Sequence, residues 1–130
     1  MKTIWTNGCF DILHIGHIKM LEKAKSRGDV LVVGIDSDAR VRKLKGTNRP
    51  FNSEQDRSEF LRSIKFVDEV FVFDSEDEME DLVLSLGIDE IVVGEEYKGR
   101  HVVGSRHAPV YFFPRIGDYS TSKILGSADI

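Results

Sequence analysis

Short apolar runs recur along the chain, and most are rich in β-branched or aromatic side chains. They cover residues 3–7, 30–35, 69–73, 90–94 and 109–113. Such short, continuous runs are typical of strands that are buried on both faces of a parallel sheet. The pattern therefore predicts five strands of this kind.

Segments with helical periodicity separate the predicted strands. Over residues 17–27 an apolar stripe runs through Leu21 and Ala24, and charged residues occupy the opposite face. We expect Arg27 and Gly28 to end this helix, because a cation suits the carboxyl end of a helix and glycine accepts a left-handed cap.

Further helices are predicted over residues 53–64 and 76–86. Asn52 is the expected N-cap of the first, with Gln55 three residues further on. A last short helix is predicted to begin near Ser120.

Strand and helix alternate through the whole chain, and we find no repeat or linker that would divide it. This order predicts a single α/β domain over residues 1–130, with a five-stranded parallel sheet, helices on both faces and right-handed crossovers. Ligands bind such sheets beyond the carboxyl ends of the strands. The candidate site loops are therefore residues 8–16, 36–52, 94–108 and 114–120.

Composition and charge exclude several classes of function. The net charge of −4 and the pI near 5.5 argue against a general nucleic-acid binder. No apolar run approaches a membrane span, and the amino terminus lacks the pattern of a signal peptide. The single cysteine excludes an internal disulfide and suits a reducing compartment, so we expect a cytoplasmic protein without a membrane or nucleic-acid partner.

The stretch GCFDILHIGH, residues 8–17, carries the candidate chemistry. We expect Gly8 to permit a sharp turn after the first strand, and Gly16 to let a ligand approach the start of the helix. A helix start attracts anions, and His14 and His17 are spaced to share one side of it. Their N–H groups can donate to phosphate oxygens.

Other interpretations of the histidine pair remain open. A zinc site is disfavoured, because no third ligand follows at an obvious spacing and helical zinc pairs more often lie four residues apart, so we expect no metal held by protein ligands. Both histidines could instead be structural, hydrogen-bonded residues. Cys9 lies nearby without an evident base, and we interpret it as a small buried residue.

The motif resembles the G-x-F-D…H-x-G-H signature of the cytidylyltransferase-like nucleotidyltransferases, and the resemblance covers nearly the whole chain. Four further segments match that family in the expected order: SDARVRKLKGTNRP (37–50), EQDRSEFLRSIKFVDEVFVF (54–73), VVGEEYKG (92–99) and STSKI (120–124). The first is most similar to adenylyltransferase domains that form ADP-heptose. The chain length and PRIGDYSTSKI resemble the small glycerol-3-phosphate cytidylyltransferases.

The resemblance implies a Rossmann-like fold and transfer of a nucleoside monophosphate from a nucleoside triphosphate to a phosphorylated sugar or polyol. Pyrophosphate is released, Mg²⁺ accompanies the triphosphate, and no covalent enzyme intermediate is formed. Family members of this size are commonly dimers, so a homodimer is expected. Such a site must hold two anions in line and neutralise their charge.

The same resemblance implies roles for individual residues. The catalytic candidates are His14, His17, Lys45 and Arg115. The nucleotide-binding candidates are Gly8, Cys9, Phe10, Asp11, Gly16, Arg57, Gly94, Glu96, Tyr97, Ser120 and Thr121.

Several of these residues have a plainer alternative role. The basic run RVRKLKG, residues 40–46, is expected on the loop after the second strand, and it could equally be a solvated helix face. By resemblance, Lys45 is the first candidate to contact the transferred phosphate, and Lys43 is the second. Ser120 and Thr121 could simply cap a helix.

The acidic residues and Arg57 also have two interpretations. The alternative role of Arg57 is a surface ion pair with Glu54 or Asp56. Asp11 is expected near the histidines, where it would orient one of them or interact with Mg²⁺. Asp36 and Asp38 are interpreted first as turn residues that follow the second strand.

One segment departs from the family pattern. The glycerol-phosphate enzymes read R-T-x-G-x-S-T, whereas here Ile116 replaces the threonine and Asp118 occupies the glycine position. A carboxylate beside a triphosphate is unfavourable unless it faces away or helps to hold Mg²⁺.

Three functions follow in order of preference. The first is a nucleotidyltransferase, preferably an adenylyltransferase acting on a sugar phosphate of the heptose 1-phosphate type, with CTP-dependent formation of CDP-glycerol as the alternative. The second is a nucleotide-binding module without turnover, which the altered 116–118 segment keeps open. A flavin-binding carrier has no support, because the paired histidines have no role there.

Overall fold

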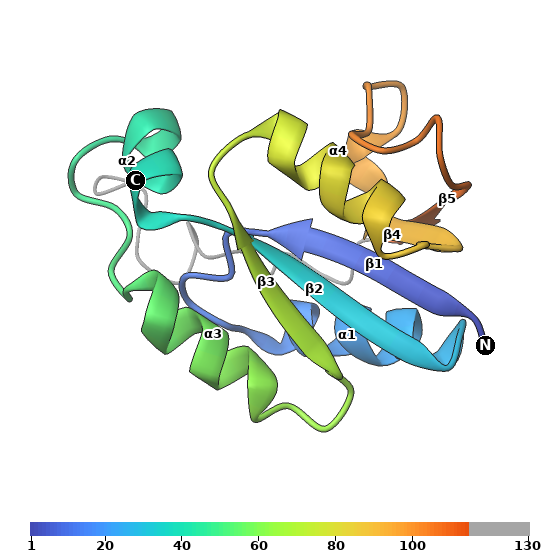
Figure 1. The fold of residues 1–130 in the computed structure, drawn as a ribbon. Helices are drawn as coiled ribbons and strands as arrows, with labels where there is room; N and C mark the ends of the chain where they lie inside the picture. The colour runs from blue at the N-terminus through green and yellow to red at the C-terminus, as the bar shows by residue number, and fades with distance from the viewer. Residues whose placement is uncertain (115–130) are drawn as a thin grey trace.

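The computed structural model describes residues 1–114, which form a parallel sheet flanked by helices (Figure 1). Its five strands are β1 (Thr3–Gly8), β2 (Val30–Asp36), β3 (Glu69–Phe73), β4 (Glu90–Gly94) and β5 (Val110–Phe113). The helices are α1 (Ile15–Ser26), α2 (Asp38–Lys45), α3 (Glu54–Arg62) and α4 (Glu76–Ser85), with the 3₁₀-helix η1 (Glu95–Tyr97). The predicted α/β architecture is confirmed.

The strands lie in the order β3-β2-β1-β4-β5, and all neighbours are parallel. The chain moves outward from β1 to β2 and β3, and then returns to the other side of β1 as β4. The direction of winding therefore reverses between β1 and β4. In open parallel sheets, ligands bind at this reversal, outside the carboxyl ends of the strands.

Two apolar clusters cover the two faces of the sheet. In the first, Leu21 of α1 and Leu61 of α3 pack with Ile4 of β1; in the second, Met79 and Val83 of α4 pack with Trp5. Figure 1 shows α1 and α3 together on one face and α4 on the other. Ile4 and Trp5 are both fully buried, because β1 lies in the middle of the sheet and successive side chains point to opposite faces.

The region after β2 differs from the prediction. Residues 40–46 were expected on a loop, but most of them belong to helix α2, which ends at Lys45 with Gly46 as its C-cap. Val41 and Leu44 are the only large apolar residues of this segment, too few to indicate a helix, and only Val41 is buried. The basic side chains instead suit the negative carboxyl end of α2.

The predictions for the C-cap of α1 and the N-cap of α3 were also partly wrong. Arg27 is the C-cap of α1, but Gly28 is not left-handed; a side chain there would overlap Ile4 and the Lys2 carbonyl, so glycine is required for close packing. The N-cap of α3 is Ser53, whose hydroxyl accepts from the Asp56 N–H. The helix predicted near Ser120 lies outside the described residues. Within residues 1–114, no helix is long and apolar enough to cross a membrane.

Candidate functional site

Two histidines cap the start of α1. His14 is the N-cap, and its Nδ1 accepts from the Gly16 N–H at 3.1 Å. The His14 N–H in turn donates to Nδ1 of His17 at 3.2 Å. This is a reciprocal capping box in which imidazoles replace the usual hydroxyl and carboxylate. The structural and functional interpretations of the pair are therefore compatible, because only one nitrogen of each ring is used in capping.

The capping contacts fix the protonation of both rings. An Nδ1 that accepts a backbone N–H carries no hydrogen, so in each neutral ring the hydrogen is on Nε2. Burial lowers the pKa of His14. Burial, and then the neighbouring His14 and Lys45, lower the pKa of His17 to about 4. Both residues are therefore neutral donors through Nε2 at physiological pH.

The turn before α1 is built differently from the expectation. Gly8 is the last residue of β1 and is not left-handed, whereas Phe10 has a φ of +51°. The Phe10 ring is buried and lies 5.3 Å from the His17 ring, measured between centroids. The sharp turn expected at Gly8 thus occurs at Phe10. Such a conformation in a bulky residue persists only where the surrounding structure fixes it.

Gly16 also has a different role from the one expected. Its N–H donates to His14, so it is not presented to a ligand in this structure. The N–H of His17 points back to the His14 carbonyl oxygen at 3.0 Å. The donors that this helix start offers are therefore mainly the imidazole Nε2–H groups.

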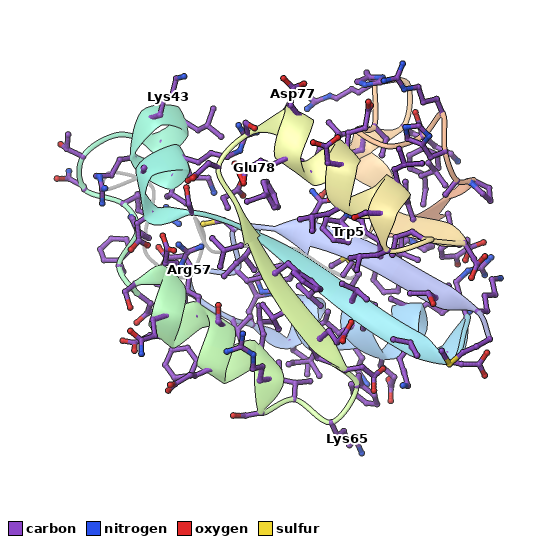
Figure 2. The ribbon with its side chains drawn as sticks, viewed as in Figure 1. Trp5, Lys43, Arg57, Lys65, Asp77 and Glu78 are labelled. Atoms are coloured by element: carbon purple, nitrogen blue, oxygen red, sulfur yellow. The ribbon has the colours of Figure 1, made fainter. Side chains whose placement is uncertain are left out.

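Lys45 at the end of α2 lies beside the histidine pair. Its charge contributes to lowering the pKa of His17 and opposes the effect of burial on the pKa of Cys9. The Lys45 side chain is exposed, and so is that of Lys43. Figure 2 shows Lys43 at the outer side of α2, pointing away from the sheet. Of the two lysines, the structure thus brings Lys45 to the histidines.

Asp11 organises the loop that leads into α3. Its side chain is buried and accepts from Arg49 Nε at 3.0 Å and from the backbone N–H groups of Phe51 and Asn52, each at 2.8 Å. The Asn52 amide donates back to the Asp11 carbonyl oxygen at 2.6 Å. Asp11 therefore does not orient a histidine, and both of its carboxylate oxygens are already occupied.

Arg57 joins three segments beneath the site. It is fully buried, and its guanidinium donates to the carbonyl oxygens of Cys9, Asp36 and Asn52 and to the Asp38 carboxylate, over 2.8–3.0 Å. The alternative of a surface ion pair with Glu54 or Asp56 is therefore wrong. Four of its hydrogen-bonding sites face protein acceptors, so the geometry supports a positioning role for Arg57.

The two aspartates after β2 are structural, as first interpreted. Asp36 pairs with Arg40 at 2.8 Å. Asp38 accepts from the Glu54 N–H at 2.8 Å, while its own N–H donates to the Glu54 carboxylate at 2.9 Å. Asp38 thereby links the first turns of α2 and α3.

Cys9 is half-buried, close to its expected setting. Burial raises the pKa of the thiol, and the nearby Lys45 and Arg57 only partly offset this. The group is therefore a thiol rather than a thiolate at neutral pH, which does not favour a nucleophilic role.

The segment after β4 also lies at the carboxyl ends of the strands. Gly94 ends β4, and the Glu96 carboxylate folds back against it in the space that a side chain would occupy. Burial raises the pKa of Tyr97, and the carboxylates of Glu96 and Asp36 add to this effect. Because Asp36 ends β2, the phenol lies near the carboxyl ends of the central strands.

Three predicted site residues, Arg115, Ser120 and Thr121, lie outside the described residues, as do Ile116 and Asp118. Among residues 1–114, no group of three or more His, Cys, Asp or Glu side chains is placed to hold a metal ion. Sequence reasoning missed Arg49 and Asn52. Their partner Asp11 is about 40 positions away in the chain, and no local pattern indicates the pairing.

Comparison with known proteins gives consistent matches. The sequence profile described as cytidylyltransferase-like matches residues 5–126. The chain is 50% identical over 125 residues to the bifunctional protein HldE of Campylobacter jejuni (strain RM1221), covering 95% of this chain and 27% of that protein. It is 52% identical over 104 residues to the bifunctional protein HldE of Campylobacter curvus, covering 80% and 22%. The chain spans about a quarter of the length of these curated relatives.

Solved structures agree with the fold. The lipopolysaccharide core biosynthesis protein from Thermoplasma volcanium superposes with a TM-score of 0.69 at 28% identity, over 92% of this chain and 99% of that one. A pantothenate synthetase from Thermus thermophilus also gives a TM-score of 0.69, at 15% identity, over 99% of this chain and 63% of that one. The second likeness concerns the fold alone.

Proposed function

This chain belongs to the cytidylyltransferase-like family of nucleotidyltransferases, and from that membership we propose that it transfers a nucleoside monophosphate to a phosphorylated sugar. We propose further that the nucleotide is ATP and that the acceptor is a sugar phosphate of the heptose 1-phosphate type. The support is the resemblance of residues 37–50 to ADP-heptose-forming domains. The solved structure at 28% identity is named for lipopolysaccharide core biosynthesis, which supports an acceptor of the sugar class.

The observation that carries the proposal is the neutral His14–His17 pair with Lys45 beside it. An oxygen of the sugar phosphate attacks the α-phosphorus of the triphosphate and forms a new P–O bond. The bond from the α-phosphorus to the oxygen that bridges to the β-phosphorus breaks, and pyrophosphate leaves with the electron pair. Negative charge builds on phosphate oxygens during this exchange, and fixed N–H donors and a lysine stabilise it.

The described residues supply donors rather than acids or metal ligands. Both imidazoles are already neutral, so they donate hydrogen bonds and do not need to give up a proton. The Asp11 carboxylate faces Arg49 and two backbone N–H groups, so it is not presented to a cation. We therefore propose that Mg²⁺ enters bound to the triphosphate, where it neutralises phosphate charge.

A substrate matrix tests this function. ATP, CTP, GTP and UTP are each incubated with heptose 1-phosphate, other sugar 1-phosphates and glycerol 3-phosphate in the presence of Mg²⁺, and pyrophosphate release is measured. The expected result is the highest kcat/KM for ATP with heptose 1-phosphate. A maximum for CTP with glycerol 3-phosphate would reassign the substrates, and nucleotide binding without pyrophosphate release would indicate a non-catalytic module.

A further inference from the structure

The two central strands separate at the site. The hydrogen-bonded register of β1 with β2 runs from Thr3 to Gly8, whereas the register of β1 with β4 covers only Ile4 and Trp5. Beyond Trp5, β1 therefore has a strand neighbour on one side only. Asn7 follows two residues later, at the point where the winding of the sheet reverses and where ligands bind in such sheets.

The Asn7 side chain is held in one orientation. The Trp5 indole Nε1–H donates to Asn7 Oδ1 at 3.0 Å, and an indole can only donate, so the amide oxygen must face it. Asn7 Nδ2 then points away from the indole with two hydrogens. Within residues 1–114, this nitrogen has no hydrogen-bond partner, although the side chain is partly buried.

The tryptophan that orients the amide is itself fixed. Trp5 is fully buried between the sheet and α4 (Figure 2). Its ring lies across β2 at Gly34, where a side chain would overlap it. The packing of Trp5 over Gly34 therefore fixes the orientation of the Asn7 amide. Because exposed asparagines rotate freely, such support is typical of a side chain that binds something.

Asn7 and the histidines lie on opposite faces of the sheet. Side chains alternate along a strand, and Asn7 shares its face with Trp5, on the side covered by α4. The histidines begin α1, which covers the other face. The carboxyl end of β1 separates the two positions.

We propose that the Asn7 amide binds a hydroxyl oxygen of the acceptor sugar, which makes Asn7 a specificity-determining residue; this inference rests on the proposed nucleotidyl transfer. In that transfer the attacking and leaving oxygens lie on opposite sides of the α-phosphorus. With the triphosphate at the histidine pair, the acceptor approaches from the side of Asn7. An uncharged donor suits a sugar hydroxyl, whereas the phosphates are matched by lysine.

The test compares variants at Asn7 by steady-state kinetics with ATP and heptose 1-phosphate. Asn7→Ala removes the amide, and Asn7→Asp keeps its shape but replaces the donor nitrogen with oxygen. Both are expected to raise the KM for heptose 1-phosphate by about tenfold, the effect of one good hydrogen bond, with the KM for ATP changed less than about twofold. Gln55→Glu on the exposed face of α3 makes the same amide-to-acid change away from the site and should alter neither KM.

Trp5→Phe adds an independent test. It removes the N–H that orients the amide while leaving Asn7 in place. The expected result is a smaller rise in the KM for heptose 1-phosphate, again without a change for ATP. Should this core variant fail to fold, the two Asn7 variants alone decide, with circular dichroism showing that they are folded.

The possible results distinguish the role of Asn7 from the proposed nucleotidyl transfer. An unchanged KM for heptose 1-phosphate in folded Asn7→Ala, with normal wild-type turnover, overturns the inference and leaves the proposed function standing. A rise confined to ATP places Asn7 at the nucleotide and also overturns it. Failure of the wild type to release pyrophosphate with any sugar phosphate overturns the proposed function and this inference together.

Discussion

The imidazole ring of His14 stacks on that of His17, with centroids 3.8 Å apart and ring planes inclined by 27°. Two protonated rings at this distance would repel each other, and partial burial further disfavours charge on either ring. The stack is therefore stable with both rings neutral. It holds the two rings together at the start of α1, each with its hydrogen on Nε2, and we expect these N–H groups to donate to phosphate oxygens.

Substitution at His14 separates its capping role from its proposed catalytic role. His14→Ala should lose the helix cap, about 1 kcal/mol of stability, and reduce kcat by roughly 10²-fold. His14→Asn supplies an oxygen acceptor suited to an N-cap but lacks the Nε2–H, so it should recover stability and not turnover. Urea denaturation and steady-state kinetics on both variants measure the two effects. Full activity in folded His14→Asn would contradict a catalytic role.

The free energy of unfolding should depend on pH, because His17 binds a proton less readily in the folded chain than in the unfolded chain. Its pKa is about 4 in the folded chain and near 6.5 when exposed. Between these values the unfolded chain binds more protons, so the free energy of unfolding decreases as the pH falls from 6.5 to 4. The full shift corresponds to on the order of 3 kcal/mol.

His17→Gln is the comparison for this pH effect. Because the variant lacks the titrating ring, its free energy of unfolding should fall less between pH 6.5 and pH 4 than that of the wild type. The free energy of unfolding of the wild type minus that of the variant should therefore decrease as the pH falls. Denaturant unfolding at several pH values measures this difference. Parallel stability curves for the two proteins would show that the His17 pKa is not depressed in the folded state.

Removal of the Arg57 guanidinium should destabilise the fold strongly. Arg57→Met keeps an unbranched side chain but removes the donor to three carbonyl groups and the cation that pairs with Asp38, whose carboxylate keeps the Glu54 N–H; this loss should cost about 3–5 kcal/mol. Arg62→Ala, at an exposed position of the same helix, should change stability by less than about 0.5 kcal/mol. Thermal unfolding of the two variants provides the measurement, and similar values for both would refute the positioning role.

Lys45 can be tested without relying on turnover. Lys45→Ala should raise the pKa of His17, because the lysine charge contributes to its depression, and should also reduce kcat. Lys43→Ala should leave the His17 pKa unchanged, since Lys43 does not contribute to it. NMR titration of the imidazole signals reports both effects. Equal losses of kcat in the two variants would contradict the choice of Lys45 over Lys43.

The sheet was predictable because each of its strands carries a local signal. Continuous apolar runs such as residues 30–35 mark buried strands, and the helices between them show apolar faces. Helix α2 was missed because tertiary contacts and capping hold it, with only Val41 buried. Its Ser37 N-cap, followed by Asp38 and ending in basic residues, is the signal that could have revealed it.

The site was predictable only where its parts are contiguous in sequence. The pairing of His14 with His17 follows from their spacing on one helix turn. The contacts of Asp11 with Arg49 and Asn52 join residues about 40 positions apart, and no periodicity encodes them. The same long-range bonds explain the wrong N-cap: Asn52 is held by Asp11, so the neighbouring Ser53 caps α3.

The buried guanidinium of Arg57 has a consequence for engineering. One side chain binds the segments that follow β1, end β2 and precede α3, so these three segments are held in fixed positions relative to one another. A loop carrying the histidines, transplanted alone into another scaffold, would arrive without its anchor. Grafts or chimaeras should therefore exchange residues 8–17 together with 36–57 as one cassette.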